Sequence, residues 1–421
     1  MSIYQDIVET IIKDIQNGTL KKGSKLPSIR QLSQTYACSK DTAQRALLEL
    51  KYQNYIYAVP KSGYYVLEGR NEVDNKVLLN LNDYNRLAYE DFKLCLDESL
   101  AGHQDYLFNY YHEQAGLKDL LEALKSRLIA DDIYVNSDQI VITSGSQQAL
   151  YILSQMDFGN GGYKILLEQP TYHRMNQLVN RQNLAYETIN RGFDGLDFDR
   201  LEEYFTSGQI KFFYTISRYS NPLGLSYSAS EKEKLAQLAN QYNVYIVEDD
   251  YMGDFSDSKN LPIHYYDTKN QTIYIKSFSM ALFPGLRLGS LVLPPNLKPT
   301  FLSHKGLIDY DTNLIMQKAL SVYLANGMFQ KNIKKLGDLF QQNMAKSQAI
   351  IEKSKVSIPY QISPRHVTWQ LPKEFSLEKF KAHKQIRFLE SSFIRPTSET
   401  YLQIGHGQEL ESFIKLLKKT K

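Results

Sequence analysis

The 421-residue sequence has little cysteine, no long apolar run and almost no net charge. Cys38 and Cys95 are its only cysteines; two thiols give neither a disulfide framework nor a metal site, which suits a reducing cytoplasm. No apolar run approaches the roughly 20 residues that span a bilayer, so no membrane partner is expected. The opening stretch, MSIYQDIVETIIKDIQNG, carries acidic residues and a helical periodicity, which is not the pattern of a signal peptide.

The net charge of +3 is unevenly distributed along the chain. Residues 1–70 hold ten Lys and Arg against six Asp and Glu, a net +4, and the remaining 39 basic and 40 acidic residues give −1. A basic N-terminal segment before a near-neutral remainder favours a polyanionic partner at the N-terminus. The length predicts two to three domains, and 43% hydrophobic and 23% charged residues are typical of a globular protein.

Residues 1–68 show the pattern of a winged helix-turn-helix. Isoleucines recur every fourth residue from Ile3 to Ile15, which predicts an amphipathic helix that ends near Gly18. A short helix is expected over 29–36, and a third begins at Ser39, a favourable N-cap. Two aromatic, β-branched runs, YIYAVP and GYYVLE, then predict a β-hairpin.

Residues 69–79 are polar and aperiodic and are interpreted as a linker to a second domain, 80–421. There, helical segments alternate with short apolar runs, which predicts a mostly parallel α/β sheet in a large subdomain, about 100–294. The expected strands are at 139–145, 163–169, 210–217, 244–250, 272–278 and 288–294. A helical stretch and a smaller α+β subdomain are expected over about 295–421.

The segment LPSIRQLSQTYACSKDTAQRALLEL resembles the winged helix-turn-helix of GntR-type bacterial regulators. Such proteins place the N-terminal end of the second helix in the DNA major groove, while the wing tip reaches the neighbouring groove or backbone. The expected partner is therefore an operator in double-stranded DNA. The candidate contacts are Arg30, Ser39, Lys40, Thr42, Arg45, Lys61 and Gly63. The alternative is a winged helix used for protein contacts, in which these residues are plain surface.

From about residue 80 onward, the chain resembles fold-type I aminotransferases that use pyridoxal 5'-phosphate. The resemblance rests on AGLKDLLEALKSRL, ITSGSQQAL, LEQPTYHRM, YSNPLG, VEDDYMGDF and KSFSMALFPGLRLGS. Together with the N-terminal motif, this order of parts resembles the MocR/GabR branch of GntR regulators, which covers essentially the whole chain.

The aminotransferase resemblance implies a role for each pocket residue. A phosphate cup is implied at Ser146, Gln147, Ser277, Ser279 and Arg287, with the two amides at a helix N-terminus and Arg287 as the charged fork. A ring site is implied in which Tyr172 stacks on the pyridine, Asp249 pairs with the pyridinium nitrogen, and Asn221 and Tyr251 bond the ring hydroxyl. Tyr111 resembles a residue that reaches the phosphate of a neighbouring subunit, which implies a homodimer.

Two positions depart from the aminotransferase pattern. The family's Schiff-base lysine falls at Met280, and a thioether forms no imine and carries no charge. Lys276 is four residues earlier, about 13 Å away along an extended strand, too far to replace it. The substrate-carboxylate arginine falls at Gln403, although Arg395 or Arg365 could supply the charge instead.

These departures leave three hypotheses. In the first, the chain is a regulator whose degenerate domain serves dimerisation and can sense a phosphorylated ligand non-covalently. In the second, it is a regulator that retains pyridoxal phosphate binding, and in the third it is a working aminotransferase. The third is disfavoured because both the imine and its proton transfer need the missing lysine.

Overall fold

The computed structural model describes residues 3–53, 55–59, 62–67, 81–101, 105–108, 114–372, 380, 383, 385–395 and 399–420. The chain forms two compact units, each made of three stretches. The first comprises Met1–Tyr110, Ala281–Phe283 and Asn313–Lys334, and the second comprises Tyr111–Met280, Pro284–Thr312 and Lys335–Lys421. The helix that follows the expected linker thus groups with the winged helix, whereas the sequence-based boundary placed everything from residue 80 onward together.

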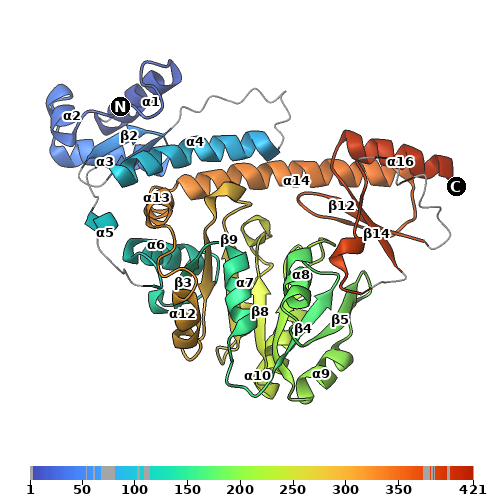
Figure 1. Cartoon of the computed structure of the whole chain (residues 1–421). Coiled ribbons are helices and arrows are strands. Elements are labelled where there is room, and N and C mark those ends of the chain that lie inside the picture. Colours follow the sequence, from blue (N-terminus) through green and yellow to red (C-terminus); the bar gives the residue numbers. More distant parts are fainter. Residues whose placement is uncertain are drawn as a thin grey trace. The chain divides into compact units, whose positions relative to one another are not determined.

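The first unit begins with a winged helix-turn-helix (Figure 1). It consists of α1 (Ile3–Gln16), α2 (Ile29–Thr35), α3 (Lys40–Tyr52) and an antiparallel hairpin of β1 (Ile56–Val59) and β2 (Gly63–Val66). Ile7, Ile11 and Ile15 of α1 are buried in one core with Ala46 and Leu50 of α3. The four-residue spacing of the isoleucines therefore places one face of α1 on this core.

Two serine caps fix where the second and third helices begin. The Ser28 hydroxyl accepts a hydrogen bond from the amide of Gln31, whose side chain accepts one from the Ser28 amide, which forms a capping box. The Ser39 hydroxyl accepts from the Thr42 amide at 3.0 Å. These caps satisfy amides that a helix end leaves free, so the turn between the two helices has a defined geometry.

Further helices contribute to the first unit. Phe283, in the short stretch contributed by Ala281–Phe283, packs edge-on against the rings of Phe92 and Tyr89 at 5.4 and 5.6 Å between centroids. On the same helix, Asp91 forms an ion pair of 2.6 Å with Lys22 of the winged helix. The helices concerned are α4 (Leu81–Leu100), α5 (Asp105–Phe108), α13 (Leu314–Ala325) and the start of α14 (Met328–Ser354).

The second unit is built on an eight-stranded sheet of order β3-β10-β9-β8-β7-β4-β5-β6. Strands β9, β8, β7, β4 and β5 are parallel, whereas β10 is antiparallel to both neighbours and β6 to β5. All six predicted strands are present: β3 (Ile140–Thr143), β4 (Lys164–Gln169), β7 (Ile210–Thr215), β8 (Tyr245–Asp249), β9 (Thr272–Ser277) and β10 (Gly289–Val292). Two further strands, β5 (Tyr186–Gly192) and β6 (Gly195–Leu196), extend one edge.

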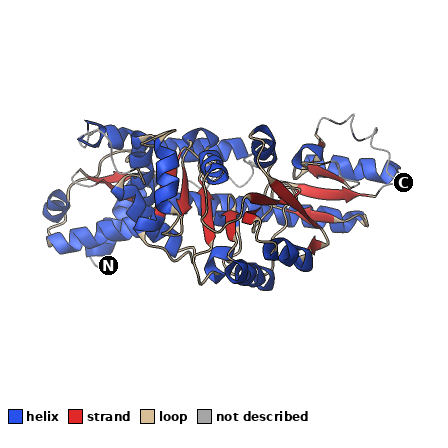
Figure 2. Ribbon diagram, turned by 60° about the horizontal axis from the view of Figure 1, so that its bottom comes forward, coloured by secondary structure: helices blue, strands red, loops and turns tan. Residues whose placement is uncertain are grey.

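Helices lie on both faces of this sheet (Figures 1 and 2). Every residue of β7 and β8 is buried, as expected for parallel strands that are covered on both sides. One core cluster joins Phe213 of β7 and Ile246 of β8 to Phe205 of α9 and Leu235 of α10. The helices of the second unit around this sheet are α6 (Lys118–Ile129), α7 (Ser146–Gln155), α8 (His173–Arg181), α9 (Phe198–Thr206), α10 (Ala229–Tyr242), α11 (Ile263–Tyr266) and α12 (Lys298–Gly306).

The C-terminal part is the smaller α+β element that the sequence predicts. Its antiparallel sheet has the order β11-β12-β14-β13, and the fully buried Trp369 lies in a core with Phe413 of the last helix. The elements are β11 (Tyr360–Ile362), β12 (Val367–Leu371), β13 (Arg387–Phe388), β14 (Thr400–Ile404) and α16 (Gln408–Thr420). Across the described ranges, no helix is both long and apolar enough to cross a membrane.

Candidate functional site

Four of the seven predicted DNA-contacting residues lie at the start of α3: Ser39, Lys40, Thr42 and Arg45. Lys40 and Arg45 are exposed on this helix, and Arg30 is exposed at the start of α2. The hydroxyl oxygens of Ser39 and Thr42 lie 2.9 Å apart, and the Ser39 hydroxyl also accepts from the Thr42 amide, so these two residues cap the start of the helix. In helix-turn-helix proteins, the N-terminal end of the second helix meets phosphates and base edges, and Lys40 has this position on α3.

Two further contacts refine this surface. The Arg45 guanidinium lies 5.0 Å from the centroid of the Tyr4 ring, so α1 helps to orient it. At the wing, Gly63 has a φ of +129°, and the exposed Lys25 lies 5.8 Å from the ring of Tyr65. The sequence pattern did not select Lys25, because its place beside the hairpin depends on an isolated bridge to Tyr65. Lys61 lies outside the described residues.

The second unit contains a cavity of about 250 Å³ at the carboxyl ends of the parallel strands. In open α/β sheets this edge is where ligands bind. The cavity is lined by nine of the ten predicted cofactor residues and by Met280; the nine are Ser146, Gln147, Tyr172, Asn221, Asp249, Tyr251, Ser277, Ser279 and Arg287. The tenth, Tyr111, lies outside the described residues. Ile216 and Arg365 complete the lining.

One end of the cavity is suited to an anion. Gly145 precedes α7 with a φ of +82°, and a Cβ there would lie 3.0 Å from the guanidinium of Arg287, so glycine keeps this space open. The Ser146 hydroxyl begins the helix, is buried and has no hydrogen-bond partner among the described residues. Free amides at the N-terminus of a ten-residue helix, an unpaired hydroxyl and an arginine form a site for phosphate.

The floor of the cavity carries a buried carboxylate. Tyr214 donates a hydrogen bond to Oδ2 of Asp249 at 2.8 Å, whereas Oδ1 has no partner among the described residues. Burial raises the pKa of Asp249 to about 6; the Tyr214 hydrogen bond opposes the shift, and Asp250 adds to it. An unpaired buried acceptor that lines a pocket is suited to a cationic N–H donor such as a pyridinium.

Tyr172 lines the cavity at the implied ring site, and a hydrogen bond fixes the position of its side chain. Tyr172 caps α8, and its hydroxyl accepts a hydrogen bond from the Gln147 side chain at 3.0 Å. Gln147 therefore orients Tyr172 with its side chain, which leaves its backbone amide for the anion. Within the described part of the chain, no cluster of His, Cys, Asp or Glu could hold a metal ion.

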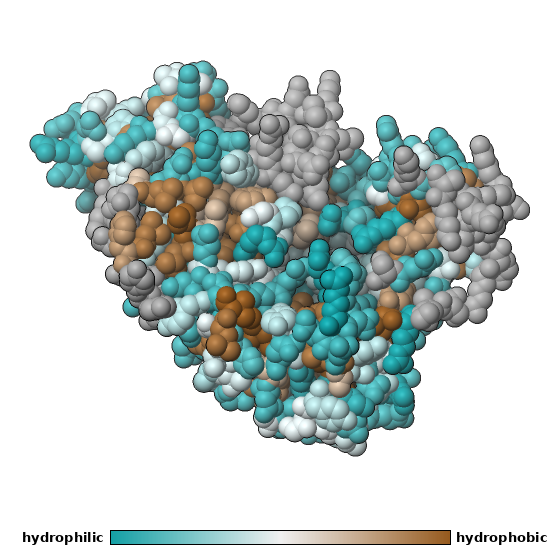
Figure 3. All heavy atoms as spheres, viewed as in Figure 1, coloured by the Kyte–Doolittle hydropathy of each residue, from teal (hydrophilic) through white to brown (hydrophobic). Residues whose placement is uncertain are grey.

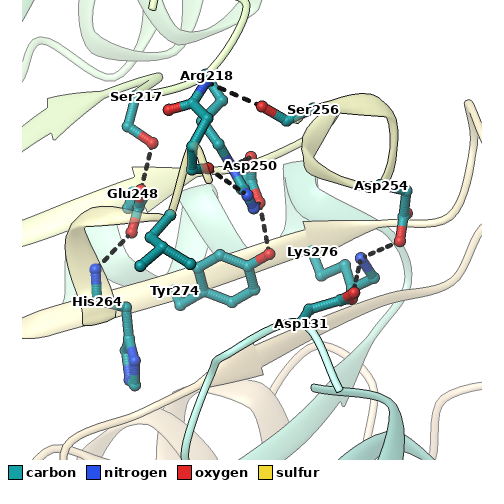
Figure 4. Close-up of polar contacts among 12 residues, drawn as sticks. Asp131, Ser217, Arg218, Glu248, Asp250, Asp254, Ser256, His264, Tyr274 and Lys276 are labelled. Carbon is teal, nitrogen blue, oxygen red and sulfur yellow. Dashed lines mark hydrogen bonds and ion pairs between the residues drawn. The ribbon is translucent and has the colours of Figure 1, made fainter. Parts of the chain in front are cut away.

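A buried polar network supports the strands behind the cavity (Figure 4). Arg218 binds Asp250 through Nε at 3.1 Å, and the Tyr274 hydroxyl donates to the same carboxylate at 2.5 Å. Glu248 accepts from the amides of Ile263 and His264 at 2.8 and 3.0 Å. Both acidic neighbours of Asp249 thus have several partners, whereas Asp249 keeps one oxygen free.

Met280 lies in the cavity, and Lys276 does not. Lys276 is buried on β9, where its ammonium pairs with Asp254 at 2.7 Å and with Asp131 at 3.7 Å (Figure 4). The next residue, Ser277, lines the cavity, as expected when successive side chains of a strand alternate between faces. The sulfur of Met280 lies 3.6 Å from Nη1 of Arg365. Among the described residues, the lining thus contains a thioether and two arginines, Arg287 and Arg365, and no lysine amine.

Gln403 is buried on β14, and its side-chain amide donates to the Pro222 carbonyl at 2.5 Å. Of the two arginines considered as replacements, Arg365 lines the cavity and Arg395 lies over the ring of Tyr186 instead, 5.8 Å from its centroid. Sequence reasoning missed Arg387, which pairs with Gln403 across β13 and β14 and lines a smaller adjoining cavity. Only the strand register reveals it.

Two stretches of the sequence match known families. Residues 3–66 match bacterial regulatory proteins of the gntR family, and residues 74–360 match aminotransferase class I and II. The chain is 39% identical over 349 residues to the uncharacterized HTH-type transcriptional regulator YcxD of Bacillus subtilis (strain 168), covering 81% of this chain and 78% of that protein. It is 26% identical over 370 residues to the uncharacterized HTH-type transcriptional regulator YdcR of Escherichia coli (strain K12), covering 80% and 78%.

Solved aminotransferases share the fold. A multiple substrate aminotransferase from Thermococcus profundus superposes with a TM-score of 0.70 at 24% identity, covering 90% of this chain and 94% of that one. A kynurenine aminotransferase from Pyrococcus horikoshii gives a TM-score of 0.69 at 22% identity, covering 90% and 93%. At these identities the likeness extends to the fold alone.

Proposed function

Because the chain belongs to the gntR family of bacterial regulatory proteins, with a class I and II aminotransferase domain behind its DNA-binding domain, we propose that it regulates transcription without catalysing transamination. The order of its domains and the motifs quoted above resemble the MocR/GabR branch of that family. In this proposal the winged helix binds an operator, and the second unit binds a phosphorylated B6 vitamer non-covalently. Binding of the vitamer then acts as the signal.

The observation that carries this proposal is the position of Met280. It lines the cavity at the position where the resemblance implies a lysine, and its sulfur can neither attack an aldehyde nor carry a proton. Lys276 does not compensate, because two carboxylates hold its ammonium within a buried network. Removing that ammonium from its partners would leave buried charges unpaired, which is costly.

The remaining residues suit a B6 vitamer. Pyridoxal 5'-phosphate supplies an aldehyde for amines and an electron-withdrawing ring. The amides at the start of α7, the Ser146 hydroxyl and Arg287 would hold its phosphate. The free oxygen of Asp249 would accept the ring N–H, and Tyr172 would cover the ring face. This assignment is supported by the two buried polar atoms left without partners, Oγ of Ser146 and Oδ1 of Asp249.

Homodimerisation is part of the proposal, because apolar surface remains uncovered. α13 is apolar around most of its circumference, yet Leu314, Ile315 and Met316 are only half-buried, and Figure 3 shows hydrophobic surface gathered over α4 and α13. In the second unit, Leu307 and Ile308 are 86% and 52% exposed. Exposed apolar surface of this kind marks an interface, and a second copy of the chain is its proposed occupant.

Borohydride fixation tests the absence of covalent chemistry. Protein mixed with pyridoxal 5'-phosphate and reduced with borohydride should show no fixed adduct on Lys276 in peptide mass spectra. The Met280→Lys variant should gain an adduct at position 280, since the new amine would lie in the cavity. Pyridoxamine 5'-phosphate should still bind the wild-type protein in a calorimeter. An adduct on Lys276 of the wild type would overturn the non-covalent assignment.

A further inference from the structure

A third cavity, the α7–α8 cavity, lies between two helices of the second unit that contact each other (Figure 1). Gln147 and Tyr172 line both this cavity and the larger one. The hydrogen bond of 3.0 Å between these two side chains therefore belongs to the wall that the cavities share. The α7–α8 cavity has a volume of about 210 Å³, close to the 250 Å³ of the larger cavity, so it accommodates a molecule of similar size.

The residues that line the α7–α8 cavity recur every three or four positions along each helix, which places them on one face of that helix. They include Gln147, Leu150 and Tyr151 of α7 and Arg174, Leu178 and Arg181 of α8. Another side of α8 is held in place by the buried Asn176, which accepts from the Gln169 side chain and donates to the Ser392 carbonyl, each at 2.9 Å. This wall of the cavity is therefore preorganised for a ligand.

The α7–α8 cavity carries positive charge without a described counterion. Arg174 and Arg181 are exposed, and neither forms an ion pair with any described residue. No Asp or Glu is among the described residues that line the cavity. Because a guanidinium presents a planar fork of N–H donors, it matches a carboxylate in a bidentate geometry. The lining is thus suited to an anionic group.

The rest of the lining is suited to an aromatic ring. Leu150 is buried and Leu178 is half-buried, so their side chains give the cavity apolar walls. Tyr151 is 38% exposed and Tyr172 is half-buried, and both contribute aromatic surface. Ligand sites commonly combine such apolar and aromatic walls with a few charged groups that fix orientation. An inorganic anion would leave the apolar part of this lining without a contact.

From this lining we propose that the α7–α8 cavity binds an aromatic carboxylate, whose ring packs on Leu150 and Tyr151 and whose carboxylate binds the two arginines of α8. The site is distinct from the proposed B6 site and does not depend on that proposal. Its occupant also contacts Tyr172, the residue that would cover the B6 ring. Binding is non-covalent and requires no chemical step on the protein.

Two compounds of the same shape test this proposal on the full chain. 2-Naphthoate carries a carboxylate, and 2-naphthamide replaces it with a neutral amide. Wild-type protein should bind 2-naphthoate about 10-fold more tightly in calorimetry, because the amide receives no charge-assisted fork. The Arg174→Gln, Arg181→Gln double variant should lose this preference and still bind 2-naphthamide. Arg200→Gln, a matched change of an exposed arginine on α9 outside the cavity, should keep the preference.

Two further measurements identify the cavity that the probe enters. Tyr151→Ala should weaken binding of both probes alike, because it removes ring surface and no charge. Saturating pyridoxamine 5'-phosphate should not displace 2-naphthoate. Competition between the two would place the probe in the larger cavity and overturn the proposal, as would equal affinity of wild type for the two probes or failure to bind 2-naphthoate. Failure of pyridoxamine 5'-phosphate to bind would overturn the B6 site alone, and the arginine variants would still decide this one.

Discussion

At the scale of single residues, the free oxygen of Asp249 links the cavity to protein stability. Its carboxylate is buried, with one hydrogen bond from Tyr214 and an oxygen without a described partner. Burial therefore raises its pKa from 3.8 to about 6. The folded state then binds a proton more readily than the unfolded state. The contribution of this carboxyl group to the free energy of unfolding is therefore fully present below about pH 4 and is lost as the pH rises through about 6.

The Asp249→Asn substitution should remove this pH dependence. Without ligand, the variant should be more stable than wild type at pH 8, by up to roughly 3 kcal/mol for a shift of this size. Its amide oxygen can still accept from Tyr214. Thermal unfolding measured from pH 4 to 8 checks this expectation. Adding pyridoxamine 5'-phosphate should reverse the order, because only the carboxylate pairs with a cationic ring; equal stabilisation of both proteins would contradict the ring assignment.

The sequence predicted most of the residues that line the larger cavity but not Arg387, which lines the smaller adjoining one. Ser146 is separated from the end of β3 by two residues, and Asp249 is the last residue of β8. Because ligands bind at the carboxyl ends of strands in such sheets, sequence order was enough to place both residues. Arg387 gave no comparable pattern. It meets Gln403 only through pairing of the two-residue strand β13 with β14, and such long-range register is not written in local periodicity.

At the scale of elements, we propose that α3 is the helix of the winged helix-turn-helix that contacts DNA. Replacing Lys40 and Arg45 with alanine should weaken operator binding in a gel-shift or anisotropy titration. If each side chain contacts one phosphate, the slope of log affinity against log salt should fall by about one per residue. Loss of a base contact by Arg45 would cost roughly 1–3 kcal/mol and relax sequence preference.

Lys13→Ala is the matched control for this experiment. Lys13 is exposed on α1, outside the recognition helix, and its loss should change affinity little. Because Arg45 also lies against the Tyr4 ring, the unfolding temperature of Arg45→Ala is measured alongside. Unchanged operator affinity and salt dependence in the double variant would show that this head uses another surface.

Local patterns predicted the helices of the winged helix-turn-helix better than the strand order of the second unit. α1, α2 and α3 begin and end within about two residues of the expected positions, because isoleucine spacing and serine caps are local. The strand order of the large sheet follows from contacts between distant segments. The antiparallel β10 between β3 and β9 is such a case, since its own four residues are simply all buried.

At the scale of the whole molecule, hydrogen bonds link the turn after α12, part of the proposed dimer surface, to the proposed phosphate site. Lys305 holds this turn by donating to the carbonyls of Asp309 and Tyr310 at 2.9 Å each. The Asp309 carboxylate in turn accepts from the Ser144 hydroxyl at 2.8 Å, two residues before Ser146. A partner seated on Leu307 would therefore contact a turn that is bonded to the phosphate site.

Replacing both Leu307 and Ile308 with glutamate should dissociate the proposed homodimer. The mass in sedimentation equilibrium should fall from twice the 48.7 kDa chain to once. A partner would bury the new charges at the turn, so association of the variant is disfavoured. Its affinity for pyridoxamine 5'-phosphate should therefore be lower than that of wild type, and should recover only at protein concentrations that restore association. Tyr163→Glu, at an aromatic residue elsewhere that is 59% exposed, is the control. A wild-type protein that sediments as a monomer would overturn the dimer.

The short stretch Ala281–Phe283 bears on how a substitution beside the cavity is interpreted. It belongs to the first unit, where Phe283 packs edge-on against Phe92 and Tyr89, whereas Met280 before it and Arg287 after it belong to the second unit and line its cavity. A substitution at Phe283 therefore removes aromatic packing from the first unit, although residues three and four positions away in the sequence line the cavity of the second.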